Sequence, residues 1–187
     1  MPKTKKNIVN SKKSVDEWNK TNDLNPLPPT VSKGKQIKHK FKNIKVASVE
    51  YTDGVVGSTF IHFEKGARVY EEVTGGFANR VTCNNISSDN TIFGLCLSGG
   101  STLGLEATTG AIAELMRKQD YYLPLTNFQI SGGIIFGSMT KNGNLYYADK
   151  ELGRFAVRNL KDSIIKIGQV GGGLGASHGQ GAAYGEK

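Results

Sequence analysis

A short polar loop, Ser98-Gly99-Gly100-Ser101, has the residue types of a binding site for a carboxylate, a phosphate or an oxyanion. It follows an apolar run at 91–97 and precedes a segment with helical periodicity, so its backbone N–H groups would lie at the start of a helix. The same pattern is also typical of a tight turn where a helix packs closely on a sheet. From spacing alone, the turn is favoured.

The nucleophiles and bases around this loop do not form a recognisable catalytic set. Ser98 and Ser101 lack the GxSxG sequence of a nucleophile elbow, which favours a structural or substrate-contacting role. His178 is a candidate base, but no Ser–His–Asp set is identifiable around it. Cys96 lies in the apolar run, where burial raises the pKa of a thiol, so a core position is favoured over a reactive one.

Two further polar residues lie in predicted secondary structure. Glu106 falls in the first turn of the expected helix, where a carboxylate interacts favourably with the helix dipole. Contact with a substrate amine is the alternative role for Glu106. His62 alternates with Phe63 and is predicted at the surface or edge of a strand.

The composition excludes several classes of protein. No run approaches the roughly 18 to 20 apolar residues of a membrane helix, and the basic start is not followed by the apolar stretch of a secretory signal. Cys83 and Cys96 make neither a disulfide framework nor a zinc motif, because no CxxC or Cys/His cluster is present. We expect a cytoplasmic protein without a membrane partner, a metal or a cofactor.

The positive charge is concentrated near the N-terminus. The chain of 187 residues has a formal net charge of +8, and residues 1–45 contain twelve lysines against three acidic residues. The remainder contains twelve lysines and arginines against thirteen acidic residues, so it is close to neutral. Because polar residues and prolines accompany the lysines, residues 1–43 are predicted to be a disordered basic leader. Such an arm can bind nucleic acid or an acidic surface, but a solvated leader is favoured and nucleic acid is not expected.

From residue 44 onward, strand and helix patterns predict one α+β domain over 44–187. Strand patterns occur at 44–51, 57–63, 67–73, 91–97, 127–136, 145–147 and 164–167. Helical periodicity occurs at 105–116 and 149–160. A turn at 52–54 suggests that the first strands form an antiparallel meander. Ser101 or Thr102 is the expected N-cap of the first helix.

Several short motifs occur in the order and approximate spacing of one hydrolase family. They are GST at 57–59, GAR at 66–68, LSGG at 97–100, GLEA at 104–107, DK-LGR at 149–154 and GGGLGAS at 171–177. Through these motifs, residues 44–184 resemble the N-terminal half of the family that contains the nylon-oligomer (6-aminohexanoate oligomer) endohydrolases, the L-aminopeptidase/D-esterases and the β-peptidyl aminopeptidases. Each motif is weak alone, but their common order is specific.

The resemblance implies an N-terminal-nucleophile fold with αββα architecture, of which this chain would hold only the larger-subunit part. Family precursors cleave themselves, and the new N-terminal Thr or Ser of the smaller chain is the nucleophile, with its own α-amino group as the base. The expected partners are this C-terminal nucleophile-bearing chain, an amide or peptide substrate with a free amino end, and further copies in a homo-oligomer.

The resemblance also assigns a substrate site, with no catalytic residue in this chain. The substrate-binding positions are Ser98, Gly99, Gly100, Ser101, Phe136, Gly172, Gly173 and Gln180. Gln180 stands at the position of a family Lys, or else 179–183 matches a later GQGAA and the Lys loop is deleted; a neutral Gln cannot lower a neighbouring pKa as Lys does. Phe136 stands where several family members have Tyr. The nucleophile segment and the family's oxyanion-binding Asn do not occur in these residues.

Two functions follow from this pattern. In the first, the chain is the larger-subunit part of an amide hydrolase of the aminopeptidase or 6-aminohexanoate-oligomer type, and the end at Lys187 leaves the expected domain unfinished. In the alternative, it is a catalytically inactive scaffold or interaction protein derived from that fold. A nucleotide-binding module is a weaker third possibility, because no GxxxxGK[ST] motif is present.

Overall fold

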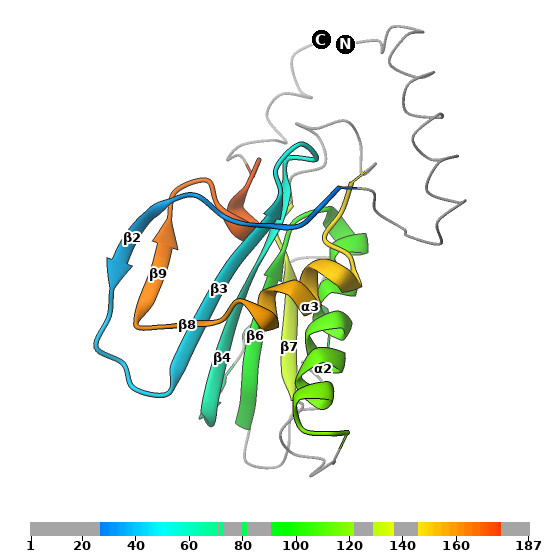
Figure 1. Ribbon diagram of the computed structural model, residues 1–187. Coiled ribbons are helices and arrows are strands. Elements are labelled where there is room, and N and C mark those ends of the chain that lie inside the picture. Colours follow the sequence, from blue (N-terminus) through cyan, green and yellow to red (C-terminus); the bar gives the residue numbers. More distant parts are fainter. Residues whose placement is uncertain are drawn as a thin grey trace, which may run out of the picture.

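The computed structural model describes residues 27–70, 72, 80–81, 91–121, 129–136 and 146–176, which form a mixed α+β domain, as predicted (Figure 1). The main sheet has the strand order β1-β3-β4-β6-β7-β5, and β8 also pairs with β3. These strands are β1 Thr30–Val31, β3 Ile44–Tyr51, β4 Val56–Arg68, β5 Arg80–Val81, β6 Thr91–Ser98, β7 Ile130–Ile134 and β8 Lys161–Asp162. Neighbouring strands are antiparallel except β6 and β7, which are parallel.

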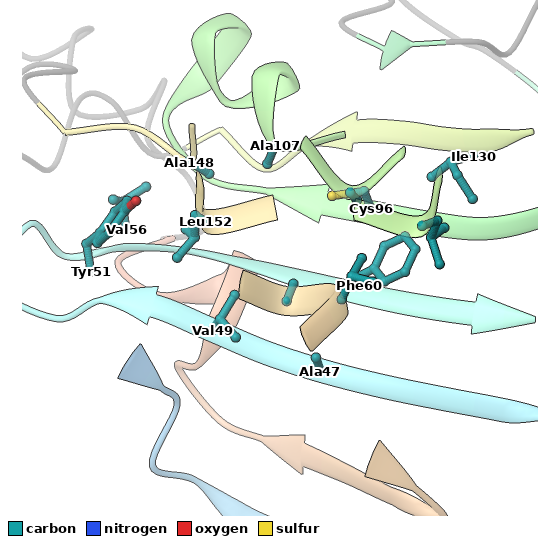
Figure 2. Close-up of a cluster of buried hydrophobic side chains, with 14 residues drawn as sticks. Ala47, Val49, Tyr51, Val56, Phe60, Cys96, Ala107, Ile130, Ala148 and Leu152 are labelled. Atoms are coloured by element: carbon teal, nitrogen blue, oxygen red, sulfur yellow. The ribbon is translucent and has the colours of Figure 1, made fainter. Parts of the chain in front are cut away.

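Two helices, α2 (Glu106–Lys118) and α3 (Lys150–Arg158), cover one face of the sheet (Figure 1). A crossover between parallel strands commonly contains a helix, and α2 occupies this position between β6 and β7. The sheet and the helices share one apolar core (Figure 2). Its buried members are Ala47, Val49, Tyr51, Val56, Phe60, Cys96, Ala107, Ala111, Leu115, Ile130, Ala148, Leu152, Ala156 and Val157.

The two helices pack closely because glycines lie where they cross. A Cβ on Gly110 would collide with the carbonyl oxygen of Lys150, and a Cβ on Gly153 would collide with that of Ala107. The glycine of each helix is therefore pressed against the backbone of the other. The helical pattern at 149–160 is confirmed, since α3 lies within it.

Helix α3 begins at a buried capping residue. The Asp149 carboxylate accepts hydrogen bonds from the backbone N–H of Leu152 at 2.9 Å and from the Tyr51 hydroxyl at 2.8 Å. Burial, and then the charge of Asp149, raises the pKa of Tyr51, so its hydroxyl remains a donor. The expected cap of the other helix is wrong, because neither Ser101 nor Thr102 caps it. A short 3-10 helix, η2 (Ser101–Leu105), runs directly into α2 instead.

A second, two-stranded sheet pairs β2 (Lys35–Lys38) with β9 (Ile164–Ile167). Both β1 and β2 lie inside the range predicted to be a disordered leader, so that prediction is wrong for 30–38. The reason is long-range pairing, which composition does not report: β1 bonds to β3, and β2 bonds to β9. Residues 1–26 lie outside the described residues.

Strand β4 joins two segments that were predicted to be separate. The ranges 57–63 and 67–73 belong in part to one strand, Val56–Arg68, whose register with β6 shifts between His62 and Ala67. Gly66 has a φ of +75°, which lets the chain bulge there without breaking the strand. The antiparallel order of β3, β4 and β6 agrees with the expected meander.

The segment at 145–147 was predicted to be a strand, and its described residues, Tyr146 and Tyr147, are not in one. They lead into Asp149, and Tyr146 packs against the apolar core whereas Tyr147 lies against Gly100.

Candidate functional site

The predicted loop at 98–101 begins with a serine whose side chain is turned inward. Ser98 is buried, and its Oγ lies 3.0 Å from Ser58 Oγ and 3.4 Å from Cys96 Sγ. The three groups form a closed polar triangle under the helices, since Ser58 Oγ also lies 3.4 Å from Cys96 Sγ. The Ser98 hydroxyl therefore serves the interior of the protein. Cys96 is fully buried, and burial raises the pKa of its thiol, as expected for a core residue.

The two glycines of the loop are fixed by the elements around them. The Gly99 N–H donates to the carbonyl oxygen of Gly57 at 2.9 Å, and the Gly99 carbonyl accepts from the Ala148 N–H at 3.3 Å. Gly100 has a φ of +95° and lies against Tyr147, so both its conformation and the space around it require glycine. The loop is thus a tight turn, the interpretation that spacing favoured.

Ser101 follows with a φ of +59°, which is uncommon for a residue with a side chain and costs about 1 kcal/mol. Its side chain is half-buried at the start of η2. Two successive left-handed residues, Gly100 and Ser101, turn the chain from β6 into η2 and α2.

The second glycine-rich segment forms the 3-10 helix η3 (Gly171–Gly173), which packs on the sheet face opposite α2 and α3. Side chains alternate between the two faces along a strand, and Val49 and Phe60 face the core. Their neighbours Glu50 and Thr59 therefore lie on the face of the sheet that η3 covers. The Gly172 N–H donates to Thr59 Oγ1 at 3.2 Å. A Cβ on Gly172 would collide with the carbonyl oxygen of Leu97, the residue before the first loop.

Three buried polar side chains surround η3, and they were not singled out from the sequence. They are Ser32, Ser48 and Glu50. The Gly171 N–H donates to Ser32 Oγ at 3.0 Å and lies 3.4 Å from Glu50 Oε2, and the Lys166 Nζ donates to the Ser32 carbonyl. The signal that could have found Glu50 was its place between Val49 and Tyr51 at the apolar end of the strand.

These contacts determine which atoms of the predicted substrate-binding residues are available to a ligand. The N–H groups of Gly99, Gly171, Gly172 and Gly173 all donate to protein acceptors. A substrate bound at Gly99, Gly172 or Gly173 would therefore use other atoms than these N–H groups. Their role as substrate contacts stays a prediction.

The remaining predicted residues lie at the rim of the loop or outside the described residues. Phe136 is 45% exposed, and the Ile135 N–H beside it donates to the Ser98 carbonyl at 2.7 Å, which places Phe136 next to the loop. Gln180 and His178 lie outside the described residues.

Glu106 occupies the first turn of α2, as predicted, and takes part in a polar cluster beside the loop. Its Oε1 lies 3.7 Å from Lys150 Nζ. Burial, and then the charge of Glu106 and a hydrogen bond to it, raises the pKa of Tyr147 to about 12. Tyr147 is thus a hydrogen-bond donor at neutral pH, and Glu106 is engaged by two neighbours.

His62 lies on the central strand β4, so the prediction of a surface or edge position is wrong. Strand pairing decides this, because β3 and β6 bond to β4 on either side. Its Nδ1 lies 2.9 Å from the carbonyl oxygen of Phe93, and burial lowers its pKa, which keeps the imidazole neutral near pH 7.

The described part of the chain also bears on metal binding and on membrane insertion. No group of three or more His, Cys, Asp or Glu residues is placed there to hold a metal ion. Within the same ranges, no helix has the length and apolar character needed to cross a bilayer.

Comparison with known proteins agrees with the motif order. No family model matches the chain. The chain is 27% identical over 160 residues to a 6-aminohexanoate-oligomer endohydrolase of Agromyces sp. (strain KY5R), and 28% identical over 155 residues to one of Kocuria sp. (strain KY2). A third such enzyme, from Paenarthrobacter ureafaciens, is 26% identical over 160 residues.

The chain is a distant homologue of the 6-aminohexanoate-oligomer endohydrolases. The matches cover 85%, 82% and 85% of this chain but 44%, 42% and 44% of those three enzymes, so the chain spans less than half the length of these relatives.

The structure explains why the motifs shared with the endohydrolase family are short and rich in glycine. The GLEA and DK-LGR motifs meet where the helices cross, with Gly153 against Ala107. GST and GGGLGAS meet on the other face of the sheet, where Gly57 lies against the Gly171 carbonyl and Thr59 accepts from the Gly172 N–H. The motifs thus pack in pairs on either side of the loop at 98–101.

Proposed function

We propose that this chain is the larger-subunit part of an amide hydrolase of the aminopeptidase or 6-aminohexanoate-oligomer type. The nucleophilic Thr or Ser is supplied by a C-terminal chain of the same precursor, and the two chains together complete an αββα fold. The assembly acts on an amide or peptide substrate and is a homo-oligomer.

One observation carries this proposal: the distant homology to the 6-aminohexanoate-oligomer endohydrolases extends over 82–85% of the chain. Neither Ser98 nor Cys96 is arranged with a base, since the Ser98 hydroxyl and the Cys96 thiol are both turned into the core. A nucleophile from elsewhere agrees with that arrangement.

In this proposal, the chain supplies the walls of the site. Phe136 at the rim offers an exposed apolar surface to the substrate chain, and the strained turn at Gly100 and Ser101 fixes the shape of the adjoining wall. The nucleophile's own α-amino group, with an ordinary pKa near 8, serves as the base.

The test is to tag the chromosomal copy of the gene, purify the protein from its own cells, and identify every chain that co-purifies. The proposal predicts a second chain that begins with Thr or Ser, and hydrolysis of 6-aminohexanoate oligomers or aminoacyl p-nitroanilides by the purified material. A single chain without such a partner and without turnover contradicts it.

A single chain without a partner and without turnover would support the second candidate function. In that case the chain is a catalytically inactive scaffold or interaction protein with the same fold. The sequence feature that favours this alternative is Gln180 at the position of a family Lys, together with Phe136 in place of a Tyr. The first change removes a positive charge from the expected site, and the second removes a hydroxyl group.

A further inference from the structure

A basic ribbon with an apolar face lies beside the main sheet. We define this basic ribbon as residues 33–42, which contain β2, together with β9 (Figure 1). The two strands are antiparallel, with Ile37 opposite Ile165 and Lys35 opposite Ile167. Directly opposed residues point to the same face of a ribbon, so these four side chains share one face.

The apolar residues of the basic ribbon are exposed. Ile37 is 44% exposed, Ile165 37% and Ile167 41%. Phe41, in the loop between β2 and β3, is 68% exposed and contacts His39, with ring centroids 5.8 Å apart. Large aliphatic and aromatic side chains clustered on one small ribbon form a surface that another molecule can cover.

The same ribbon is strongly positive. Lys33, Lys35, Lys38, Lys40 and Lys42 are all exposed, and no acidic residue occurs between Asp23 and Glu50. The acidic residues nearest to the ribbon's end, Glu64 and Asp162, pair with Lys45, at 2.6 Å and 3.9 Å. Within the described residues, no ion pair engages the ribbon lysines, so their charge is available to an external partner.

The combination of exposed apolar side chains and positive charge limits the kinds of partner that the basic ribbon can bind. In a symmetric dimer the same patch would face itself, so Lys35, which shares the isoleucine face, would approach its own copy among the other ribbon lysines, and this disfavours a second copy of the chain. Nucleic acid would match the charge, but it offers nothing to the exposed isoleucines. Cations interspersed with protruding apolar side chains match a layer of anionic headgroups over acyl chains.

We infer that the basic ribbon binds the surface of an anionic lipid bilayer. Its lysines contact the headgroups, while Phe41 and the isoleucines enter the boundary with the acyl chains. The expectation of no membrane partner rested on the absence of an apolar span, which bears on crossing a bilayer and not on lying at its surface.

The test is binding of the purified full chain to phosphatidylglycerol–phosphatidylcholine vesicles and to pure phosphatidylcholine vesicles, by co-sedimentation. We expect binding to the anionic vesicles only, with loss of binding at high ionic strength. Because each lysine near an anionic surface strengthens binding about fivefold, Lys40→Glu with Lys42→Glu should weaken it at least about 25-fold. The control, Lys40→Arg with Lys42→Arg, keeps both charges and should bind like the wild type.

Phe41→Ser and Ile37→Ser separate ribbon binding from general attraction to the lysines elsewhere in residues 1–45, because they leave every charge in place. Each should weaken binding several-fold, whereas Tyr70→Ser, at an 81% exposed aromatic outside the ribbon, should not. Circular dichroism confirms that each variant is folded. Absence of binding to anionic vesicles overturns the inference. The inference is also overturned if Phe41→Ser and Ile37→Ser leave binding unchanged. It is overturned too if single-stranded DNA or an acidic peptide abolishes binding while the ribbon variants have no effect.

Discussion

At the scale of single residues, the site is shaped by where glycines touch other backbone atoms. Two adjacent glycines of η3 show this, because they are identical in the sequence but have different surroundings in the structure. Gly172 lies against the Leu97 carbonyl and within 3.1 Å of Ile135 Cδ1, measured from an ideal Cβ, whereas the atom nearest to a Cβ on Gly173 is 3.8 Å away.

Gly172→Ala should therefore destabilise the protein by about 1–3 kcal/mol, since either η3 or β6 must shift to admit the methyl group. The matched variant Gly173→Ala should change stability by less than about 0.5 kcal/mol. Thermal melting of both purified variants checks this. Equal melting temperatures for the two variants would contradict the packing of η3 on the sheet. If Gly173→Ala folds normally, its KM in the assembly with the proposed C-terminal chain tests the predicted substrate contact.

The inward direction of Ser98 could have been predicted from the sequence. Cys96 was expected in the core, and Ser98 is two residues further along the same strand, so period-two alternation places its side chain on the same face. The central position of His62 could not have been predicted from the sequence, because the pattern of one strand does not show how many strands pair with it.

At the scale of secondary structure elements, local pattern predicted the bounds of several strands well. The expected bounds of β3 and β9 agree with the structure, and those of β6 differ by one residue. The failures have long-range causes. The bulge in β4, the 3-10 start of α2 and the pairing of β2 with β9 all depend on contacts with distant segments.

The helix crossing gives the first prediction at this scale. Gly110→Ala or Gly153→Ala should each lower the free energy of unfolding by about 1–3 kcal/mol or more, because the added methyl group meets a backbone carbonyl of the other helix. Gly133→Ala is the control, since the nearest atom to its Cβ is a leucine methyl at 3.6 Å. Chemical denaturation measures all three variants. A crossing variant as stable as the control would mean that the helices are further apart.

A buried carboxylate also joins the helices. Glu114 of α2 accepts from Arg117 at 2.6 Å and from Arg158 of α3 at 3.1 Å. Burial alone would raise the pKa of Glu114, but the hydrogen bonds from both arginines outweigh it and lower the pKa to about 2. A depressed pKa stabilises the fold above the ordinary value near 4.3.

This stabilisation should disappear as the pH falls from about 4.3 towards 2. Glu114→Gln should therefore be less stable than the wild type at pH 7, and the difference should shrink across that acid range. Glu151→Gln, at a half-exposed partner of Arg158, should have little effect at either pH. Melting temperatures measured as a function of pH test this, and a difference that stays constant down to pH 2 would count against the pairing.

At the scale of the whole molecule, the ordered domain starts before the position that composition indicated. Strands β1 and β2 tie residues 30–38 to β3 and β9. A chain that lacks residues 1–43 should therefore melt at a lower temperature than one that lacks residues 1–26, or fail to fold. Similar melting curves for both deletions would show that β1 and β2 contribute nothing to stability.

The homologous endohydrolases are more than twice as long as the matched region. Reconstitution of activity with a second chain is therefore the most direct test of the proposed function. The measurement is hydrolysis of 6-aminohexanoate oligomers by the chain alone, and by the chain co-expressed with a C-terminal chain that begins with Thr or Ser. We predict no turnover by the chain alone, turnover with the second chain, and loss of turnover when that Thr or Ser is changed to Ala. Turnover by the chain alone that Ser101→Ala abolishes would contradict the account.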